Sequence, residues 1–128
     1  MKILHVEDEA DIREIAELAL KFDPDFEVTS VANGADALER AAEIDPELLL
    51  LDVMMPDMDG PSLLKTLRGH ARTAGTPVIF MTAAAQKHIV DDLMQLGAIG
   101  VITKPFDPMT LAEDVREIVE SRGIVAAG

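Results

Sequence analysis

Five short apolar runs divide this chain, and their character restricts the possible folds more than any other feature. The runs are Ile3–Val6, Phe26–Val31, Leu48–Leu51, Val78–Met81 and Ile99–Ile102. Three of them are nearly continuous in apolar residues, which is typical of strands in a parallel sheet that helices cover on both faces. The second run, FEVTSV, alternates more between apolar and polar residues, which favours an edge strand.

Helical patterns occupy the segments between these runs. Apolar residues recur at helical spacing in two segments, and we expect each set to form the apolar face of a helix. The first set is Ile12, Ile15, Ala16 and Ala19, and the second is Leu111, Val115, Ile118 and Val119. Propensity and pattern predict three further helices at Ala35–Ile44, Gly60–Leu67 and Ala85–Leu96.

The alternation of strands and helices predicts an α/β fold with a parallel sheet. An open doubly wound sheet suits 128 residues, whereas a closed barrel of alternating strands and helices needs about 250. No linker, repeat or low-complexity tract divides the sequence, so we expect one domain over residues 1–128. Its core is predicted to cover about residues 2–120, and residues 121–128 are predicted to form a frayed tail.

Composition excludes several classes of function. The chain has 24 Asp and Glu against 11 Lys and Arg, and this net charge of -13 argues against direct binding of nucleic acid. The absence of cysteine excludes disulfides, thiolate metal sites and cysteine nucleophiles. No apolar run approaches the roughly 18 residues of a membrane span, and acid begins at Glu7, too early for a signal peptide. We therefore expect a cytoplasmic protein without membrane contact.

Polar side chains stand at the carboxyl ends of four predicted strands. Glu7 and Asp8 follow the first strand, Asp52 the third, Thr82 the fourth and Lys104 the fifth. In an open α/β sheet, ligands bind beyond the carboxyl ends of the strands, so we expect these side chains to converge on one rim.

The predicted cluster has a specific chemistry. Three carboxylates that lie close together repel one another, and a hard cation such as Mg²⁺ relieves that repulsion and favours phosphate as a further ligand. Lys104 adds a positive charge and Thr82 a hydroxyl donor, so the set suits the transfer of a phosphoryl group. Asp52 is then the predicted nucleophile, which would form an aspartyl phosphate.

Each of these residues taken alone has a simpler interpretation. Asp8 would cap the first helix, Thr82 would be a strand-end hydroxyl and Lys104 would be solvated. Asp57 and Asp59 are predicted to be turn and N-cap residues before the third helix. The functional interpretation therefore depends on all the positions occurring together.

Other residues near the predicted rim are assigned to packing. Met54, Met55 and Met58 are expected to fill space rather than form a site. His5, inside the first strand, is expected to be a core histidine, and no other histidine has ligand-like neighbours.

These residues, in this order, resemble the receiver domain of two-component response regulators. The matching segments are HVEDE with Glu7 and Asp8, LLLLDVMMPDMDG with Asp52, PVIFMTA with Thr82, and GAIGVITKPFDP with Lys104 and Pro105. VANGADAL also resembles the second strand and helix of the family. The resemblance covers about residues 2–120, and the four segments at these spacings make it highly specific.

The resemblance implies a flavodoxin-like doubly wound sheet of five parallel strands in the order 2-1-3-4-5, with five helices. It implies that Glu7, Asp8 and Asp52 bind Mg²⁺ together with the backbone carbonyl of Met54. It also implies that Asp52 is the phosphoacceptor and that Lys104 pairs with the phosphoryl group.

The resemblance further implies a switch. Thr82 would hydrogen-bond a phosphoryl oxygen and move with the switch, and the bond between Lys104 and Pro105 would be cis. Val101 occupies the position where the family often has an aromatic switch residue, so a paired threonine and aromatic switch is not assumed. The acidic pair is Glu7 and Asp8, whereas two aspartates are commoner.

The expected function is that of a stand-alone response regulator. A sensor histidine kinase or a histidine phosphotransfer protein would supply phosphohistidine, and Asp52 would accept the phosphoryl group with Mg²⁺ as cofactor. Phosphorylation would then change contacts with a downstream protein, or the chain would pass the group on as a phosphorelay intermediate. Such a protein is a signalling phosphoacceptor and not a metabolic enzyme, although it catalyses its own phosphorylation and dephosphorylation.

Three alternatives use the same sequence features differently. A pseudo-receiver would keep the fold as an interaction module without phosphorylation, which the intact Asp52, Thr82 and Lys104 argue against. A phosphatase similar to the haloacid dehalogenases would require a second Asp two residues after the nucleophile, where this chain has Met54. A flavin-binding domain of similar topology would need aromatic rings for stacking, and the chain has no Trp or Tyr.

Overall fold

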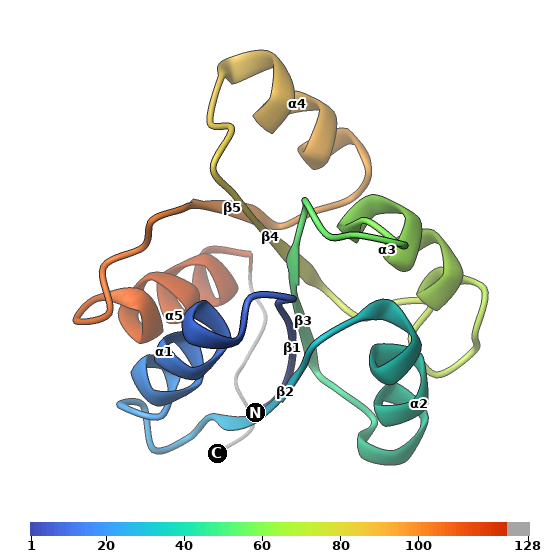
Figure 1. Cartoon of the computed structure of the whole chain (residues 1–128), viewed down its shortest axis with the longest axis horizontal. Helices are drawn as coiled ribbons and strands as arrows, with labels where there is room; N and C mark the ends of the chain where they lie inside the picture. Colours follow the sequence, from blue (N-terminus) through green and yellow to red (C-terminus); the bar gives the residue numbers. More distant parts are fainter. Residues whose placement is uncertain (123–128) are drawn as a thin grey trace.

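One parallel sheet forms the centre of the computed structural model, which describes residues 1–122, and helices cover both of its faces (Figure 1). The strands are β1 (Lys2–Val6), β2 (Glu27–Val31), β3 (Leu48–Asp52), β4 (Val78–Thr82) and β5 (Gly100–Thr103). The helices are α1 (Ala10–Leu20), α2 (Gly34–Ile44), α3 (Gly60–Arg68), α4 (Lys87–Gln95) and α5 (Leu111–Ser121). The strand order is β2-β1-β3-β4-β5, as predicted, and all neighbouring strands are parallel.

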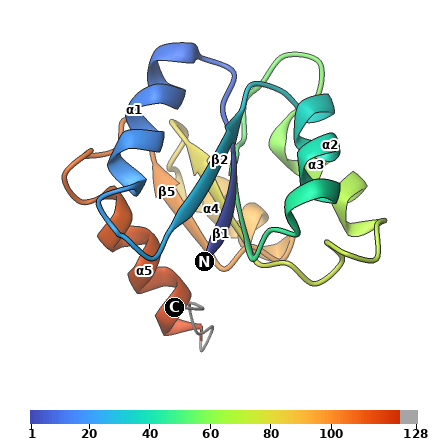
Figure 2. The same cartoon turned by 90° about the horizontal axis from the view of Figure 1, so that it is seen from below.

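The leucine run of β3 explains why the central strands are apolar without alternation. Leu48 and Leu50 belong to the core cluster shared with α1 and α5, whereas Leu49 and Leu51 belong to the cluster shared with α2, α3 and α4. Figure 2 shows α1 and α5 on one side of the sheet and α2 and α3 on the other. Because both faces of the strand are covered, every position along it is buried.

The edge strands differ from the centre as the sequence predicts. Four of the five residues of β2 are partly buried and one is exposed, whereas all residues of β3 and β4 are buried. The alternation in FEVTSV therefore reflects an edge position. Phe26 itself is buried but precedes the strand, which begins at Glu27.

The other boundaries agree with the sequence within a few residues. The largest difference is in α4, for which the sequence predicts Ala85–Leu96 and which covers Lys87–Gln95. It begins late because Gln86 has extended backbone angles and occupies the N-cap position. The predicted frayed tail is only partly described: Ser121 still belongs to α5, and residues 123–128 lie outside the described residues.

Two of the acids predicted to be structural are so. Asp59 is the N-cap of α3 and accepts a hydrogen bond from the N–H of Ser62 at 2.8 Å. Asp57 adopts a positive φ of 68° in the preceding turn. Asp8, in contrast, does not cap α1, because Glu9 occupies the N-cap position and no side-chain bond forms there.

The packing predictions hold for three of four side chains. Met55 and Met58 pack against the core cluster of α2, α3 and α4, but Met54 is 74% exposed, so its expected packing role is wrong. His5 is buried, with Nδ1 3.0 Å from Oγ of Ser30, and burial lowers the pKa of His5 to about 4.

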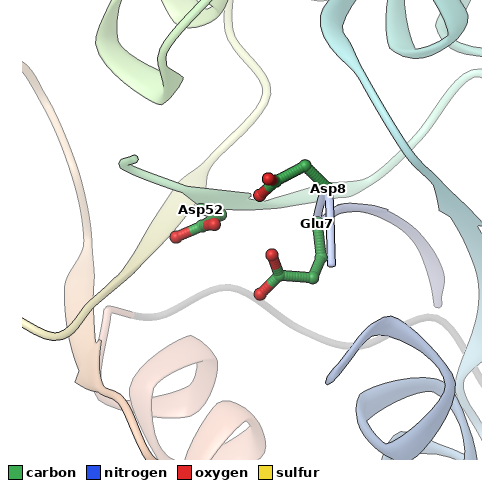
Figure 3. Close-up of side chains that lie close together, drawn as sticks. All are labelled: Glu7, Asp8 and Asp52. Carbon is green, nitrogen blue, oxygen red and sulfur yellow. The ribbon is translucent and has the colours of Figure 1, made fainter. Parts of the chain in front are cut away.

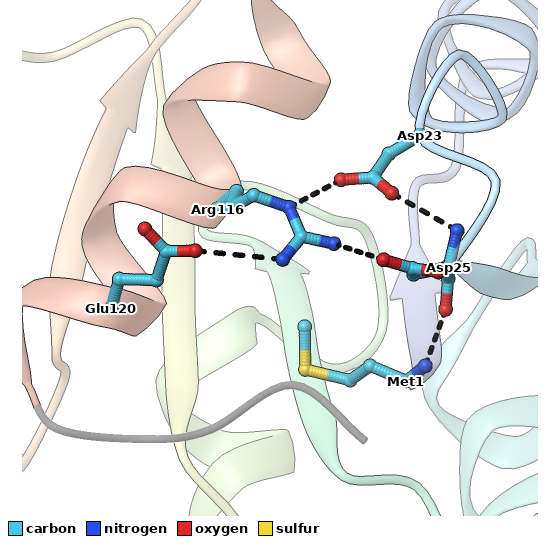
Figure 4. A network of polar contacts seen from close by, with 5 residues as sticks. All are labelled: Met1, Asp23, Asp25, Arg116 and Glu120. Atoms are coloured by element: carbon cyan, nitrogen blue, oxygen red, sulfur yellow. Dashed lines mark hydrogen bonds and ion pairs between the residues drawn. The ribbon is translucent and has the colours of Figure 1, made fainter. Parts of the chain in front are cut away.

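Arg116 connects α5 to the loop between α1 and β2 (Figure 4). Its guanidinium contacts Asp23 at 2.5 Å, Asp25 at 3.1 Å and Glu120 at 3.5 Å, and it lies 5.3 Å from the ring centroid of Phe26. The network fixes α5 at the end of the sheet opposite the carboxyl ends of the strands.

Within residues 1–122, no helix combines the length and apolar character needed to cross a membrane.

The start of α3 approaches the end of β3 closely. The N–H of Gly60 donates to the carbonyl of Val53 at 3.0 Å, which closes the loop between them. A Cβ atom on Gly60 would lie 2.4 Å from the carbonyl oxygen of Asp52. This close approach is possible only because Gly60 has no side chain.

We predict that Gly60→Ala lowers the free energy of unfolding by about 1–3 kcal/mol, because the added methyl group collides with backbone that cannot turn aside. Gly75→Ala is the matched control, since a methyl group at that site would meet no other part of the chain within 4 Å. Urea denaturation measures both. Equal stability of the two variants would contradict the close approach.

Candidate functional site

Three carboxylates meet at the carboxyl ends of β1 and β3. Glu7 and Asp8 follow β1, Asp52 is the last residue of β3, and one oxygen from each lies within 4.8 Å of the others (Figure 3). Glu7 and Asp52 are only 1% and 3% exposed, whereas Asp8 is partly exposed. The group therefore lies at the rim, with one carboxylate open to solvent.

Strand pairing brings these acids together. Val6 pairs with Leu51 in the register of β1 and β3, so the next residue of each strand, Glu7 and Asp52, reaches the same rim. The N–H of Glu7 donates to the carbonyl of Val31 at 3.1 Å, which continues the β1–β2 pairing one residue further. The register therefore holds both carboxylates on fixed backbone.

Lys104 brings a positive charge to the buried acids. Its Nζ lies 2.7 Å from Oε1 of Glu7 and 3.3 Å from Oδ2 of Asp52. Its own N–H donates to the carbonyl of Thr82 at 2.8 Å, and its peptide bond to Pro105 is cis, as the resemblance implies. The ammonium group thus contacts the acids of β1 and β3 from the far side of β4.

Thr82 is the last residue of β4 and is 1% exposed. Its Oγ1 accepts a hydrogen bond from the N–H of Ala84 at 3.0 Å. Because the hydroxyl acts as the acceptor in this bond, its own proton is available for another partner.

The pKa values of the two buried acids, Asp52 and Glu7, shift in opposite directions. Burial raises the pKa of Asp52 to about 7, and the hydrogen bond and charge of Glu7 add to that effect while Lys104 opposes it. Burial alone would also raise the pKa of Glu7, but hydrogen bonds with Lys104 and Asp52 outweigh it and lower that pKa. Burial would lower the pKa of Lys104, but its two acidic partners raise it. Without a further cation, the protonated and ionised forms of Asp52 therefore coexist near neutral pH.

This donor set fits a hard divalent cation. Carboxylate oxygens are the ligands that Mg²⁺ prefers, and a cation would replace the proton that the crowded acids otherwise hold.

The roles of Met54 as a metal ligand and of Val101 at the switch position were assigned by resemblance alone, and they stay predictions. Met54 lies two residues after Asp52 with an exposed side chain, and Val101 is partly buried against the cluster of α2, α3 and α4.

Beside the charged group lies an apolar pocket of about 450 Å³. It is lined by Glu9, Ile12, Ile15, Ala83, Lys104, Pro105, Phe106 and Pro108. Leu18, further along α1, and Phe22, two residues after its end, are 60% and 65% exposed. The site thus borders apolar side chains of α1, among which Ile15 and Leu18 are exposed.

Sequence reasoning missed this surface. Helical spacing assigns Ile15 to the apolar face of the first helix, yet Ile15 is 46% exposed, because the buried residues of α1 are Ala16, Ala19 and Leu20. The signal was present in the sequence: apolar residues surround more of this helix than one covered face requires.

Comparison with known proteins agrees with this geometry. The family model for the response regulator receiver domain matches residues 3–116. The chain is 38% identical over 117 residues to the transcriptional regulatory protein GltR of Pseudomonas aeruginosa, covering 91% of this chain and 48% of GltR. It is 39% identical over 106 residues to the regulatory protein AtoC of Escherichia coli, covering 83% of this chain and 22% of AtoC. The chain thus spans half or less of the length of these two relatives.

A solved structure gives the same result for the fold. The chemotaxis response regulator CheY4 of Vibrio cholerae superposes with a TM-score of 0.82 at 30% identity, covering 91% of this chain and 97% of CheY4. The family model matches residues 3–116, which is nearly all of the described residues, and the strand order is the one that the resemblance implies. The chain belongs to the receiver domain family of two-component response regulators.

Proposed function

We propose that Asp52 accepts a phosphoryl group from the phosphohistidine of a sensor kinase or histidine phosphotransfer protein. The observation that carries this proposal is the position of Asp52: it is buried at a strand end, between an acidic pair and an ammonium group 3.3 Å away. Nucleophile, cation-binding acids and charge-neutralising lysine thus stand together, as in-line phosphoryl transfer requires.

The chemistry follows from these groups. A carboxylate oxygen of Asp52 attacks phosphorus, the bond from phosphorus to the imidazole nitrogen of the donor breaks, and an acyl phosphate forms. Lys104 neutralises charge on the phosphoryl oxygens, and the hydroxyl of Thr82 donates a hydrogen bond to one of them. Water later attacks the phosphorus, which releases inorganic phosphate and regenerates Asp52.

Mg²⁺ would be held by Glu7, Asp8, Asp52 and the backbone carbonyl of Met54, and it would supply charge neutralisation at the transferring group. The chain's own part is to keep these oxygens close together and to keep Asp52 from being solvated. Lys104 contacts the carboxylates of Glu7 and Asp52, which are also two of the groups that would hold the cation.

Phosphorylation would change protein contacts through Thr82 and the loop that follows it. Val101 lies where the family often has an aromatic ring, so the response would depend on the backbone of this region more than on a ring rotation. The output would be binding of a downstream protein or passage of the phosphoryl group to a second histidine. A pseudo-receiver, which keeps the fold without phosphorylation, is the alternative that a phosphorylation assay would reveal.

The apolar surface on α1 suits the phosphodonor protein. Ile12 and Ile15 line the pocket that also contains Lys104, so a helix resting on them would bring its histidine to the site. Burial of Ile15, Leu18 and Phe22 would provide the hydrophobic part of this transient interface.

The first prediction of the proposed function concerns the phosphoacceptor. Incubation with acetyl phosphate and Mg²⁺ adds the mass of one phosphoryl group to the wild type but not to Asp52→Asn, because the amide is not a nucleophile. Intact mass spectrometry measures the gain. Asp57→Asn, in the loop after β3, is the matched control and retains the gain, since asparagine tolerates the positive φ at that position. If wild type and Asp52→Asn both gain the group, the acceptor lies elsewhere. If the wild type gains no phosphoryl group and also shows no Mg²⁺-dependent change of its amide spectra with beryllofluoride, the chain is a pseudo-receiver.

The second prediction concerns pH. Because the pKa of Asp52 is raised to about 7, a proton competes with Mg²⁺, and the apparent affinity for Mg²⁺ falls by about tenfold from pH 8 to pH 6. Titration followed by amide spectra measures the affinity. Asp52→Asn binds more weakly but with little dependence on pH over this range. An affinity of the wild type that is constant from pH 8 to pH 6 would contradict the raised pKa.

The third prediction concerns the donor surface. Ile15→Ser slows transfer from a phosphorylated histidine kinase by about tenfold, because an apolar contact at the interface is lost. Its phosphorylation by acetyl phosphate is unchanged, since a small donor does not reach α1. Leu96→Ser, at an exposed apolar residue just after α4, is the control and transfers at the wild-type rate. Equal loss in both variants would rule out a donor surface on α1.

A further inference from the structure

The loop that presents Glu7 and Asp8 has no ordinary helix cap. Glu9 occupies the N-cap position of α1 with extended backbone angles, and it makes no side-chain capping bond. Two metal-binding carboxylates therefore stand on a short connection between a strand and an uncapped helix. Such a connection needs other contacts if its carboxylates are to keep one orientation.

Arg13, in the first turns of α1, supplies these contacts. Its Nη1 donates to the carbonyl oxygen of Glu7 at 2.9 Å and, more weakly, to that of Asp8 at 3.5 Å. The backbone N–H of Arg13 also donates to the carbonyl of Glu9 at 2.9 Å. One residue of the helix therefore binds the backbone of all three residues of the loop.

Glu7 is consequently fixed through both of its backbone groups. Its N–H donates to Val31 of β2 at 3.1 Å, and its carbonyl accepts from Arg13 of α1. Both hydrogen bonds of the Arg13 side chain go to backbone carbonyls, so the guanidinium does not pair with the carboxylates of Glu7 and Asp8. The carboxylate of Glu7 instead accepts from Lys104 at 2.7 Å and from the N–H of Glu9 at 3.3 Å. Arg13 acts on the carboxylates through the backbone and not through direct ion pairing.

We propose that Arg13 is a positioning residue that sets the affinity of the acidic site for Mg²⁺. It holds the carbonyls of Glu7 and Asp8 so that their carboxylates converge with that of Asp52, and it touches neither the metal nor the phosphoryl group. For its place in the reaction, this inference rests on the function proposed above.

The sign of the expected effect separates this role from simple electrostatics. Arg13→Met removes a positive charge near three carboxylates, and by Coulomb's law alone that change would tighten the binding of a cation. A positioning role predicts the opposite, and loss of a residue that orients metal ligands typically weakens metal binding by about tenfold or more. Arg13→Lys retains the charge and one donor, so it recovers part of the affinity.

The experiment measures the dissociation constant of Mg²⁺ without any phosphodonor, by amide spectra of the full chain. Thermal unfolding without Mg²⁺ is recorded for each variant. Arg40→Met is the matched control, since Arg40 is an exposed arginine on α2 that pairs with Glu43 at 3.6 Å. We expect about tenfold weaker binding in Arg13→Met, a smaller loss in Arg13→Lys, and wild-type or slightly tighter binding in Arg40→Met.

Two results would overturn the inference. One is unchanged or tighter Mg²⁺ binding in Arg13→Met, whether or not that variant loses thermal stability, and the other is no Mg²⁺ binding by the wild type. If Arg13→Met does not fold, the affinity of Arg13→Lys decides, and a wild-type value overturns the inference. Failure of the proposed function has a different signature, in which Mg²⁺ binds as expected but Asp52 gains no phosphoryl group.

Discussion

The arrangement of the site depends on one ammonium group that lies between two buried carboxylates. Lys104 reaches Glu7 and Asp52 at 2.7 and 3.3 Å, from a position 97 residues beyond Glu7 in the chain. A buried carboxylate without a partner is costly, so either a cation or a proton must accompany it. The raised pKa of Asp52 shows that one lysine does not fully compensate two such acids. The remaining deficit of positive charge supports the proposed binding of a divalent cation at this site.

The sheet makes this unfavourable grouping of charges possible. Leucines of β3 pack into the cores on both faces, so the strand that ends in Asp52 is held by apolar contacts on each side. Gly60 then allows the chain to turn back against the carbonyl of Asp52. The stability lost by crowding the acids is therefore offset by packing directly beneath them, and the carboxylate of Asp52 stays in place without being solvated.

The sequence predicted a parallel sheet covered on both faces and the meeting of the charged residues, since continuous apolar runs and strand-end polar residues follow from simple rules for parallel sheets. The strand order came only from the resemblance to the receiver domain family. The sequence did not predict which of several apolar side chains on a helix become buried, or which backbone groups a long side chain contacts. Helical spacing identified Ile15 as apolar, but only the packing of α1 decides that Ala16, Ala19 and Leu20 are the residues covered. The contact of Arg13 with the carbonyls of Glu7 and Asp8 was equally hidden, because it depends on the path of the loop and leaves no periodic pattern.

The proposed response to phosphorylation does not require an aromatic ring in place of Val101. Among its residues α4 buries only Leu93, whereas α5 buries Leu111, Ala112, Val115 and Val119. Because the free energy of moving a helix rises with the apolar surface that it uncovers, α4 is the less costly of the two to displace. It also follows directly on the loop after Thr82, whose hydroxyl already bonds that loop at Ala84. A change at Thr82 can therefore reach α4 through the backbone, and an aromatic ring at position 101 is not needed to weaken its attachment.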